Sequence, residues 1–394
     1  MKRVLAMLLL LTLTFCAASC IQLLPEEPVS GSESDHTDTE SQSDLETETE
    51  PVPGVPSLPW TDARAAAEAM FAYPNGVVDL SRREYSYAEM EEDLAILAAR
   101  YPKLFSYRSF GKSVAGRELY VATLGDPNAA QKLLVSAGIH GREYLTPLLV
   151  MKQMEFLLAH YENGDYQGMA YADLFADCCL YVIPMSNPDG IMLSQAGIGS
   201  LTDPDQRATV QAVYEDDFRK GYTSQTDINE YLKYWKANAN GVDLNRNFDA
   251  LWENYRMGEP EPCHKNYKGP EPMSEPETRA LAALTDSLSG VAAVLCIHSQ
   301  GEVLYWDCGQ EDPLRAQTYA FTDVIGDRSG YELIREQNND ASYSDWCALE
   351  RDLIAVTVET GKGLCPLDLD KFEAIWFDNY DLLALSAAYF CAEE

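Results

Sequence analysis

Short apolar segments separated by helical patterns constrain the fold of this chain more than any other feature of its sequence. They are seven to nine residues long and carry few polar side chains on either face. Strands of this kind lie in sheets that are buried on both faces. Helices must then cover both faces, so the alternation predicts an α/β fold. The segments are ELYVATLG (118–125), KLLVSAGIH (132–140), CLYVIPM (179–185), VAAVLCIH (291–298) and LIAVTVE (353–359).

Helical patterns fill the intervals between these segments. Ser86 and Glu89 form a capping-box pattern, and apolar residues follow at helical spacing until a proline ends the pattern. A second capping box, Ser274 with Glu277, begins the segment SEPETRALAALTDSL. A helix also fits TPLLVMKQMEFLLAHY, and the last helix is expected within residues 367–391. The sequence shows no internal repeat and no second long linker, so we expect one domain.

Charged and titratable residues follow three of the apolar segments. His140, His298 and Glu359 end their segments, and Glu143 comes three residues after His140. A lone histidine in such a place is usually structural, and a salt bridge on a polar turn would also explain the first pair. Because ligands bind at the carboxyl ends of parallel strands, two histidines and two glutamates there favour a metal. His140, Glu143 and His298 would form a zinc site with an open position, which leaves Glu359 to act on water.

The first 58 residues predict export. Lys2 and Arg3 precede an apolar run, Val4 to Ala18, which suits a signal peptide and is short for a bilayer span. Small residues before Cys20 resemble a bacterial lipoprotein processing site, where the cysteine is lipidated; simple secretion is the alternative. The next stretch is rich in Ser, Thr, Glu, Asp and Pro and predicts a disordered tether. We therefore expect a signal peptide (1–19), a lipidated cysteine with an acidic linker (20–58) and a folded domain (59–394). The domain would lie on the outer side of the bacterial cell membrane.

The net charge of −34 limits the partners of this protein. An acidic surface repels nucleic acid and anionic lipid, so we exclude binding to a phosphate backbone. Contact with the membrane is expected only through the N-terminal lipid anchor.

Other potential metal ligands give little support for a further site. Eight cysteines follow Cys20, and none forms a CxxC pair. Export permits disulfides, but the sequence does not give their pairing. His160 ends a helical pattern and His264 lies in the polar loop EPCHKNY; neither has a carboxylate at a competing ligand spacing.

Four motifs, in a fixed order, resemble the M14 family of zinc carboxypeptidases. The family's signature is HxxE, then GVDxNRNF, then a distant histidine, then a strand that ends in glutamate. The resemblance covers about residues 80–390 and implies a single α/β/α domain with a mixed, mostly parallel sheet. It also implies one Zn²⁺ per chain and hydrolysis of a peptide bond near a free carboxylate end. The matching segments are HGRE (140–143), GVDLNRNF (241–248), IHSQG (297–301) and VTVETG (356–361).

The resemblance implies roles for the residues that match these motifs. His140, Glu143 and His298 match the zinc ligands. Glu359 matches the general base, which takes a proton from water and later gives it to the leaving amine. Asp243 matches the acid that hydrogen-bonds a ligand histidine, with a plain turn residue as the alternative.

Three further residues match the groups that contact the substrate. Asn245 and Arg246 match the pair that binds the terminal carboxylate, a task that suits a planar guanidinium. Arg142 matches an arginine beside the zinc ligands on the substrate side. A structural ion pair is the alternative for Arg142.

The sequence departs from the digestive members of the family at two places. Lys236 follows Trp235, where those members have an arginine that polarises the scissile carbonyl. A lysine still supplies positive charge there, and a solvated surface lysine is the alternative. No tyrosine stands at the place of their mobile tyrosine; Tyr343 is the nearest. Ser344 occupies the side-chain pocket position, so neither strongly basic nor strongly acidic specificity is implied, and a structural serine is equally compatible.

Several stretches resemble the bacterial γ-D-glutamyl-diamino acid peptidases, which trim murein stem peptides. They are WKAN, YKGPEPMSEPET and HSQGEVLYW, while Asn240 departs from the arginine often found in that subgroup. The expected substrate is therefore a wall stem peptide. The alternatives are a general peptide carboxypeptidase, a zinc deacylase on the same fold and a non-catalytic wall-binding lipoprotein.

Overall fold

The structure is a computed structural model that describes residues 61–72, 76–80, 84–335 and 340–391. The expected signal peptide, lipidated Cys20 and acidic linker lie outside the described residues. The first described element is helix α1 (Ala63–Phe71). Within the described part of the chain, no helix is long and apolar enough to cross a membrane.

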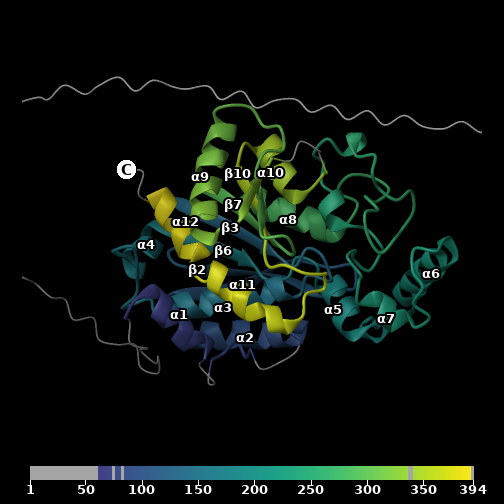
Figure 1. Cartoon of the computed structure of the whole chain (residues 1–394), viewed down its shortest axis with the longest axis horizontal. Coiled ribbons are helices and arrows are strands. Elements are labelled where there is room, and N and C mark those ends of the chain that lie inside the picture. The colour runs from purple at the N-terminus through teal and green to yellow at the C-terminus, as the bar shows by residue number, and fades with distance from the viewer. Residues whose placement is uncertain (1–60, 73–75, 81–83, 336–339, 392–394) are drawn as a thin grey trace, which may run out of the picture. The chain divides into compact units, whose positions relative to one another are not determined.

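One mixed sheet of eight strands crosses the domain (Figure 1). Its four central strands, β6, β3, β7 and β10, run parallel, while the pairs β1–β2, β2–β6 and β10–β8 are antiparallel. The predicted fold class is confirmed: the central strands are apolar because both faces of the sheet are covered. In sheet order the strands are β1 (Phe105–Lys112), β2 (Glu118–Leu124), β6 (Cys178–Ile183), β3 (Gln131–Ala137), β7 (Val291–His298), β10 (Ile354–Glu359), β8 (Val303–Tyr305) and β9 (Glu332–Ile334).

Helices pack on opposite faces of this sheet (Figure 1). Alternate residues of β3 point to different cores: Leu133 and Val135 belong to the larger core, and Leu134 belongs to the smaller one. The larger core is covered by α1, α2 (Tyr87–Arg100), α3 (Leu145–Ala159), α4 (Tyr171–Asp177), α9 (Leu314–Ser329), α11 (Phe372–Asn379) and α12 (Leu382–Cys391). The smaller core is covered by α8 (Pro276–Ser287) and α10 (Tyr343–Arg351).

A third, smaller core lies under α5 (Pro188–Ala196), α6 (Pro204–Lys220) and α7 (Ile228–Leu232). Its buried centre includes Leu193, Val210 and Trp235. The remaining elements are the hairpin β4 (Asp165–Tyr166) and β5 (Met169–Ala170) and the 3₁₀ turns η1 (Ile198–Ser200), η2 (Leu244–Arg246), η3 (Trp252–Asn254) and η4 (Leu369–Lys371).

The structure confirms one of the two predicted capping boxes. The hydroxyl of Ser86 accepts from the backbone of Glu89, and the carboxylate of Glu89 accepts from the backbone of Ser86. The predicted box of Ser274 and Glu277 is wrong, because α8 begins at Pro276 and the Glu277 carboxylate instead accepts from the Val114 N–H at 3.0 Å. A long-range contact has replaced the local one. The single helix expected within 367–391 is two helices, α11 and α12.

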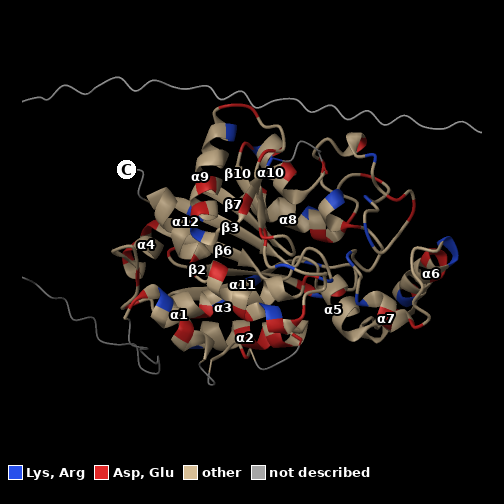
Figure 2. Cartoon of the chain, viewed as in Figure 1, with Lys and Arg blue, Asp and Glu red and all other residues tan. Residues whose placement is uncertain are grey.

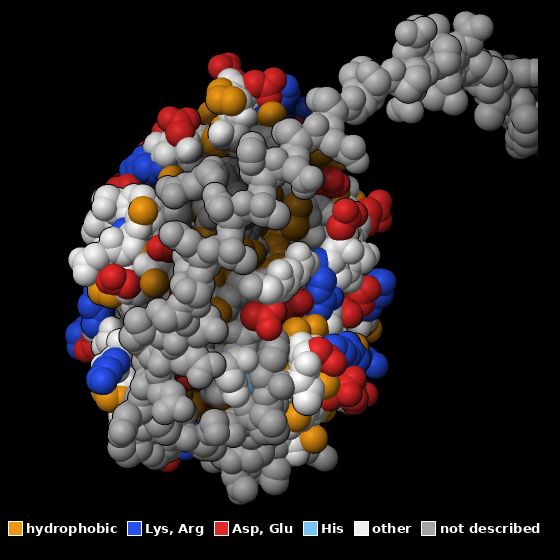
Figure 3. Space-filling view, turned by 90° about the vertical axis from the view of Figure 1, so that its left-hand side faces the viewer, with side chains coloured by type: hydrophobic (Ala, Val, Ile, Leu, Met, Phe, Trp, Pro, Cys, Tyr) orange, Lys and Arg blue, Asp and Glu red, His pale blue; other side chains and the backbone are white. Residues whose placement is uncertain are grey.

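Acidic residues are distributed over most of the described elements (Figure 2). On the face that Figure 3 presents, acidic and basic side chains are interspersed among the described residues. Many of the cations are paired, as in the contacts of Arg117 with Asp189 and of Arg328 with Asp381. On this face the charged side chains of the described residues do not form one acidic patch.

Candidate active site and metal centre

The carboxyl ends of β3, β7 and β10 bring the predicted site residues together. The three strands are parallel neighbours, so their ends meet at one edge of the sheet. His298 and Glu359 end β7 and β10 and are direct partners in the sheet register. The sequence suggested that His140 ends its strand. In the structure β3 stops at Ala137, and Gly138, at φ +62°, turns the chain toward the site. A side chain on Gly138 would collide with Ile191.

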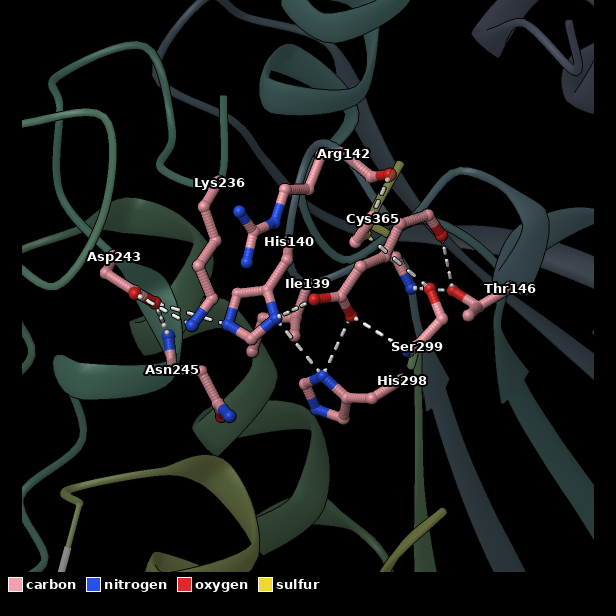
Figure 4. A network of polar contacts seen from close by, with 12 residues as sticks. Ile139, His140, Arg142, Thr146, Lys236, Asp243, Asn245, His298, Ser299 and Cys365 are labelled. Atoms are coloured by element: carbon pink, nitrogen blue, oxygen red, sulfur yellow. Dashed lines mark hydrogen bonds and ion pairs between the residues drawn. The ribbon is translucent and has the colours of Figure 1, made fainter. Parts of the chain in front are cut away.

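His140, Glu143 and His298 form a buried cluster of ligand atoms (Figure 4). Each ring Nδ1 lies close to one Glu143 oxygen, at 2.8 Å for His140 and 3.0 Å for His298. The two Nδ1 atoms are 3.2 Å apart. A hydrogen bond between the two Nδ1 atoms would need one of them to carry a hydrogen and the other to accept it, while both also face Glu143. A cation bound by both nitrogens therefore explains their short separation better than hydrogen bonds do.

The donor set fits zinc. Two imidazole nitrogens and a carboxylate are ligands that catalytic zinc takes, and bonds of about 2.0 Å place tetrahedral ligands about 3.3 Å apart. Burial lowers the pKa of His140, although the neighbouring carboxylates of Glu143 and Asp243 act to raise it. Burial opposes the charge of Glu143, but the two histidines outweigh it and hold the pKa of that carboxyl well below its usual range. One zinc ion fits this cluster.

Asp243 connects the cluster to Lys236. Its Oδ1 lies 3.3 Å from His140 Nε2, and its Oδ2 lies 3.3 Å from Lys236 Nζ (Figure 4). Burial would raise the pKa of Asp243, but Lys236 and His140 outweigh it and hold the pKa well below its usual range. Asp243 also caps η2, so it is a turn residue and a partner of His140 at once. Lys236 is not a solvated surface lysine, because its side chain is 11% exposed.

We expect Asp243→Asn to lower zinc affinity by about 10- to 100-fold, because the carboxylate that lies 3.3 Å from His140 Nε2 loses its charge. Competition of the protein with a chromophoric chelator measures this affinity. Asp327→Asn, an exposed change on α9, is the matched control and should leave the affinity unchanged. Equal affinities in the two variants would reduce Asp243 to its role in the turn.

Glu359 faces the same cavity from β10. Burial raises its pKa to about 7, while the neighbouring His298 acts to lower it. A carboxyl group with such a pKa can both accept and return a proton near neutral pH. Glu359 and Glu143 therefore differ in what they can do. Glu359 can exchange protons, whereas Glu143 is held as a carboxylate between two histidines.

The remaining predicted residues line one cavity of about 260 Å³ beside the cluster. Arg142 lines it, and its buried Nε has no hydrogen-bond partner among the described residues. The alternative of a structural ion pair for Arg142 thus gains no support. Ser344 also lines the cavity and contacts Thr357 Oγ1 at 3.1 Å. Tyr343 is buried away from it, with its hydroxyl on Thr285 at 2.7 Å.

Asn245 and Arg246 follow Asp243 and reach the other side of the cavity. Asn245 Oδ1 accepts from the Tyr343 N–H at 3.0 Å. Arg246 is paired with Asp340, whose Oδ2 lies 2.8 Å from Nη2. The sequence does not single out Asp340, because it is one of several polar residues in the loop between β9 and α10 and no motif includes it.

Comparison with known proteins agrees with this geometry. A family model described as zinc carboxypeptidase matches residues 90–350. A gamma-D-glutamyl-L-diamino acid endopeptidase 1 from Lysinibacillus sphaericus is 31% identical over 297 residues, which cover 75% of this chain and 70% of that protein. The uncharacterized protein YqgT from Bacillus subtilis (strain 168) is 28% identical over 296 residues, 74% of each chain.

A solved structure shows the same fold. The carboxypeptidase A from Helicoverpa armigera superposes with a TM-score of 0.60 at 19% sequence identity. The match covers 84% of this chain and 80% of that one.

Proposed function

Because the chain belongs to the zinc carboxypeptidase family and carries that family's hydrolase site, we propose that it hydrolyses a peptide bond near a free carboxylate in bacterial cell-wall stem peptides. The observation that supports this substrate is the 31% identity to an endopeptidase named for γ-D-glutamyl-L-diamino acid bonds. An exported, lipid-anchored enzyme outside the cell membrane would meet such peptides, and the N-terminal sequence supports that location.

Each side chain of the site has a distinct task in this reaction. Zinc, when bound, supplies Lewis-acid polarisation. Glu359 takes the proton of the attacking water and returns it to the leaving amine, as its raised pKa permits. Lys236 and Arg142 line the cavity and present positive charge to the carbonyl oxygen as negative charge develops there. Asn245 and Arg246 orient the substrate through its carboxylate.

Hydrolysis assays with the full chain test the substrate. The probes are a stem tripeptide that contains a γ-D-glutamyl-diamino acid bond and an ordinary peptide of the same length with a free C-terminus. We expect zinc-dependent release of the diamino acid from the stem peptide, with much slower cleavage of the ordinary peptide. Preferred cleavage of the ordinary peptide would make the protein a general carboxypeptidase. Cleavage of neither, with zinc bound, would favour the deacylase or a binding protein.

The Arg246–Asp340 ion pair supports a substrate that contains a diamino acid. A diamino acid presents both a carboxylate and a second ammonium group, and the pair presents a cation beside an anion. Asp340 is held by its own N–H, which donates to Asp345 Oδ2 at 2.9 Å. Its Oδ1 accepts no hydrogen bond from another described residue, and its side chain is 25% exposed at the cavity. We therefore propose that Asp340 receives the ammonium group while Arg246 receives the carboxylate.

We expect Asp340→Asn to raise KM for a stem peptide with a free second amine by about fivefold, since a partly exposed ion pair contributes about 1 kcal/mol. The KM for the same peptide with that amine acetylated should not change. Arg246→Gln is the matched variant and should raise KM for both peptides. A lower KM for both in Asp340→Asn would instead show that Asp340 competes with the substrate's carboxylate.

A further inference from the structure

A second cluster of metal-ligating side chains lies outside the active site. Asp217 is on α6, and Cys263 and His264 are in the loop between η3 and α8. All three are buried, with exposed fractions of 1%, 3% and 8%. No carboxylate near His264 in the sequence has a ligand spacing, and the structure brings it a partner acid, Asp217, from 47 residues earlier in the chain.

The distances between the donor atoms suit a tetrahedral site. Cys263 Sγ lies 3.7 Å from Asp217 Oδ2 and 3.6 Å from His264 Nδ1. A zinc ion with a Zn–S bond of about 2.3 Å and Zn–N or Zn–O bonds of about 2.0 Å separates its sulfur from its nitrogen or oxygen by about 3.5 Å. We infer that Asp217, Cys263 and His264 bind a second divalent ion, zinc by ligand type, through one thiolate, one imidazole and one carboxylate.

The third distance between donor atoms, from His264 to Asp217, is shorter than a metal site requires. His264 Nδ1 lies 2.6 Å from Asp217 Oδ2, a hydrogen-bond distance, and metal binding would open it to about 3.3 Å. The zinc cluster of the active site has the same contraction, since His140 Nδ1 lies 2.8 Å from Glu143 Oε1. A thiolate and a carboxylate together balance the charge of a divalent ion, so a buried ion would be neutralised.

The surroundings hold these ligands in place. The Tyr231 hydroxyl donates to Asp217 Oδ2 at 2.5 Å, and its ring packs edge-on against the His264 ring. The backbone carbonyl of His264 accepts from the N–H groups of Lys236 and Ala237 at 2.9 and 3.0 Å. An ion here would fix the loop that positions Lys236 in the active site. The second ion is therefore structural, and it holds α6 and α7, at one end of the molecule in Figure 1, to the catalytic segment.

Metal content and cobalt spectroscopy of the full chain separate this site from a network of hydrogen bonds alone. We expect two zinc ions per chain, and, after exchange for Co²⁺, a thiolate-to-metal charge-transfer band that the active site cannot give because its ligands carry no sulfur. Cys263→Ser should lose one ion and the band. Cys391→Ser, which removes a thiol on α12, should keep both, and His298→Ala should lose one ion and keep the band.

One ion per chain without the band would overturn the inference, as would a band that survives in Cys263→Ser. If Cys263→Ser fails to fold, anomalous scattering at the zinc edge from crystals of the unaltered protein decides the question. Two peaks, one of them beside Cys263, support the second site, and a single peak beside His140 rejects it. Neither result depends on which peptide the enzyme cleaves.

Discussion

Glu359→Gln is expected to lower kcat/KM by about 10²- to 10⁴-fold, the usual contribution of a general acid–base group. Glutamine keeps the shape of the side chain and removes its ability to take a proton. Glu359 is the cavity carboxyl whose pKa is raised to about 7, whereas Glu143 is fixed between His140 and His298. The loss should therefore appear in kcat, with KM and the zinc content of the active site unchanged.

The matched control is Glu350→Gln, which makes the same chemical change on the exposed end of α10. Steady-state kinetics and metal analysis of both variants are the measurements. A Glu359→Gln enzyme that retains activity within tenfold of the unaltered protein would require another base. Loss of zinc from this variant would instead place Glu359 among the ligands.

The zinc ligands could be predicted from sequence because strand periodicity and topology fix where strand ends meet. His298 and Glu359 end buried strands, and parallel neighbours must bring such residues to one edge. His140 was predicted as part of the same edge although β3 ends three residues earlier, because Gly138 only turns the chain and keeps His140 within reach. His140 and Glu143 are three residues apart in the motif HxxE, so their roles can be predicted with little knowledge of the tertiary structure.

Contacts between distant segments could not be predicted in this way. Asp217 and His264, or Arg246 and Asp340, are far apart in the sequence, and only the packed fold brings them together. At Glu277 a local sequence pattern predicted a contact that the folded structure does not form. The spacing of Glu277 fits a capping box in an isolated helix, but its carboxylate instead accepts from the part-buried backbone N–H of Val114, so the tertiary contact replaced the local one.

Removal of zinc should abolish hydrolysis and weaken the fold, and added zinc should restore both. A Lewis acid contributes several kcal/mol to such reactions, so the rate should fall by at least about 10³-fold. Without the ion, two imidazoles and a carboxylate remain buried in mutual contact. Zinc at about 1,000 times its dissociation constant would add about 4 kcal/mol to the free energy of unfolding. Denaturant unfolding and peptide hydrolysis, each with chelator and then with excess zinc, measure the two effects.

The same experiment in Cys263→Ser separates the two proposed ions. Because Cys263 is not a ligand of the active-site cluster, chelator should still inactivate this variant and zinc should still restore it. Its unfolding free energy should gain less from zinc than that of the unaltered protein, since only one ion remains to bind. Full activity in chelator, with metal analysis showing an empty protein, would refute a zinc mechanism for this chain. Equal stabilisation of both proteins by zinc would leave the His140–Glu143–His298 cluster as the one site at which the ion stabilises the fold.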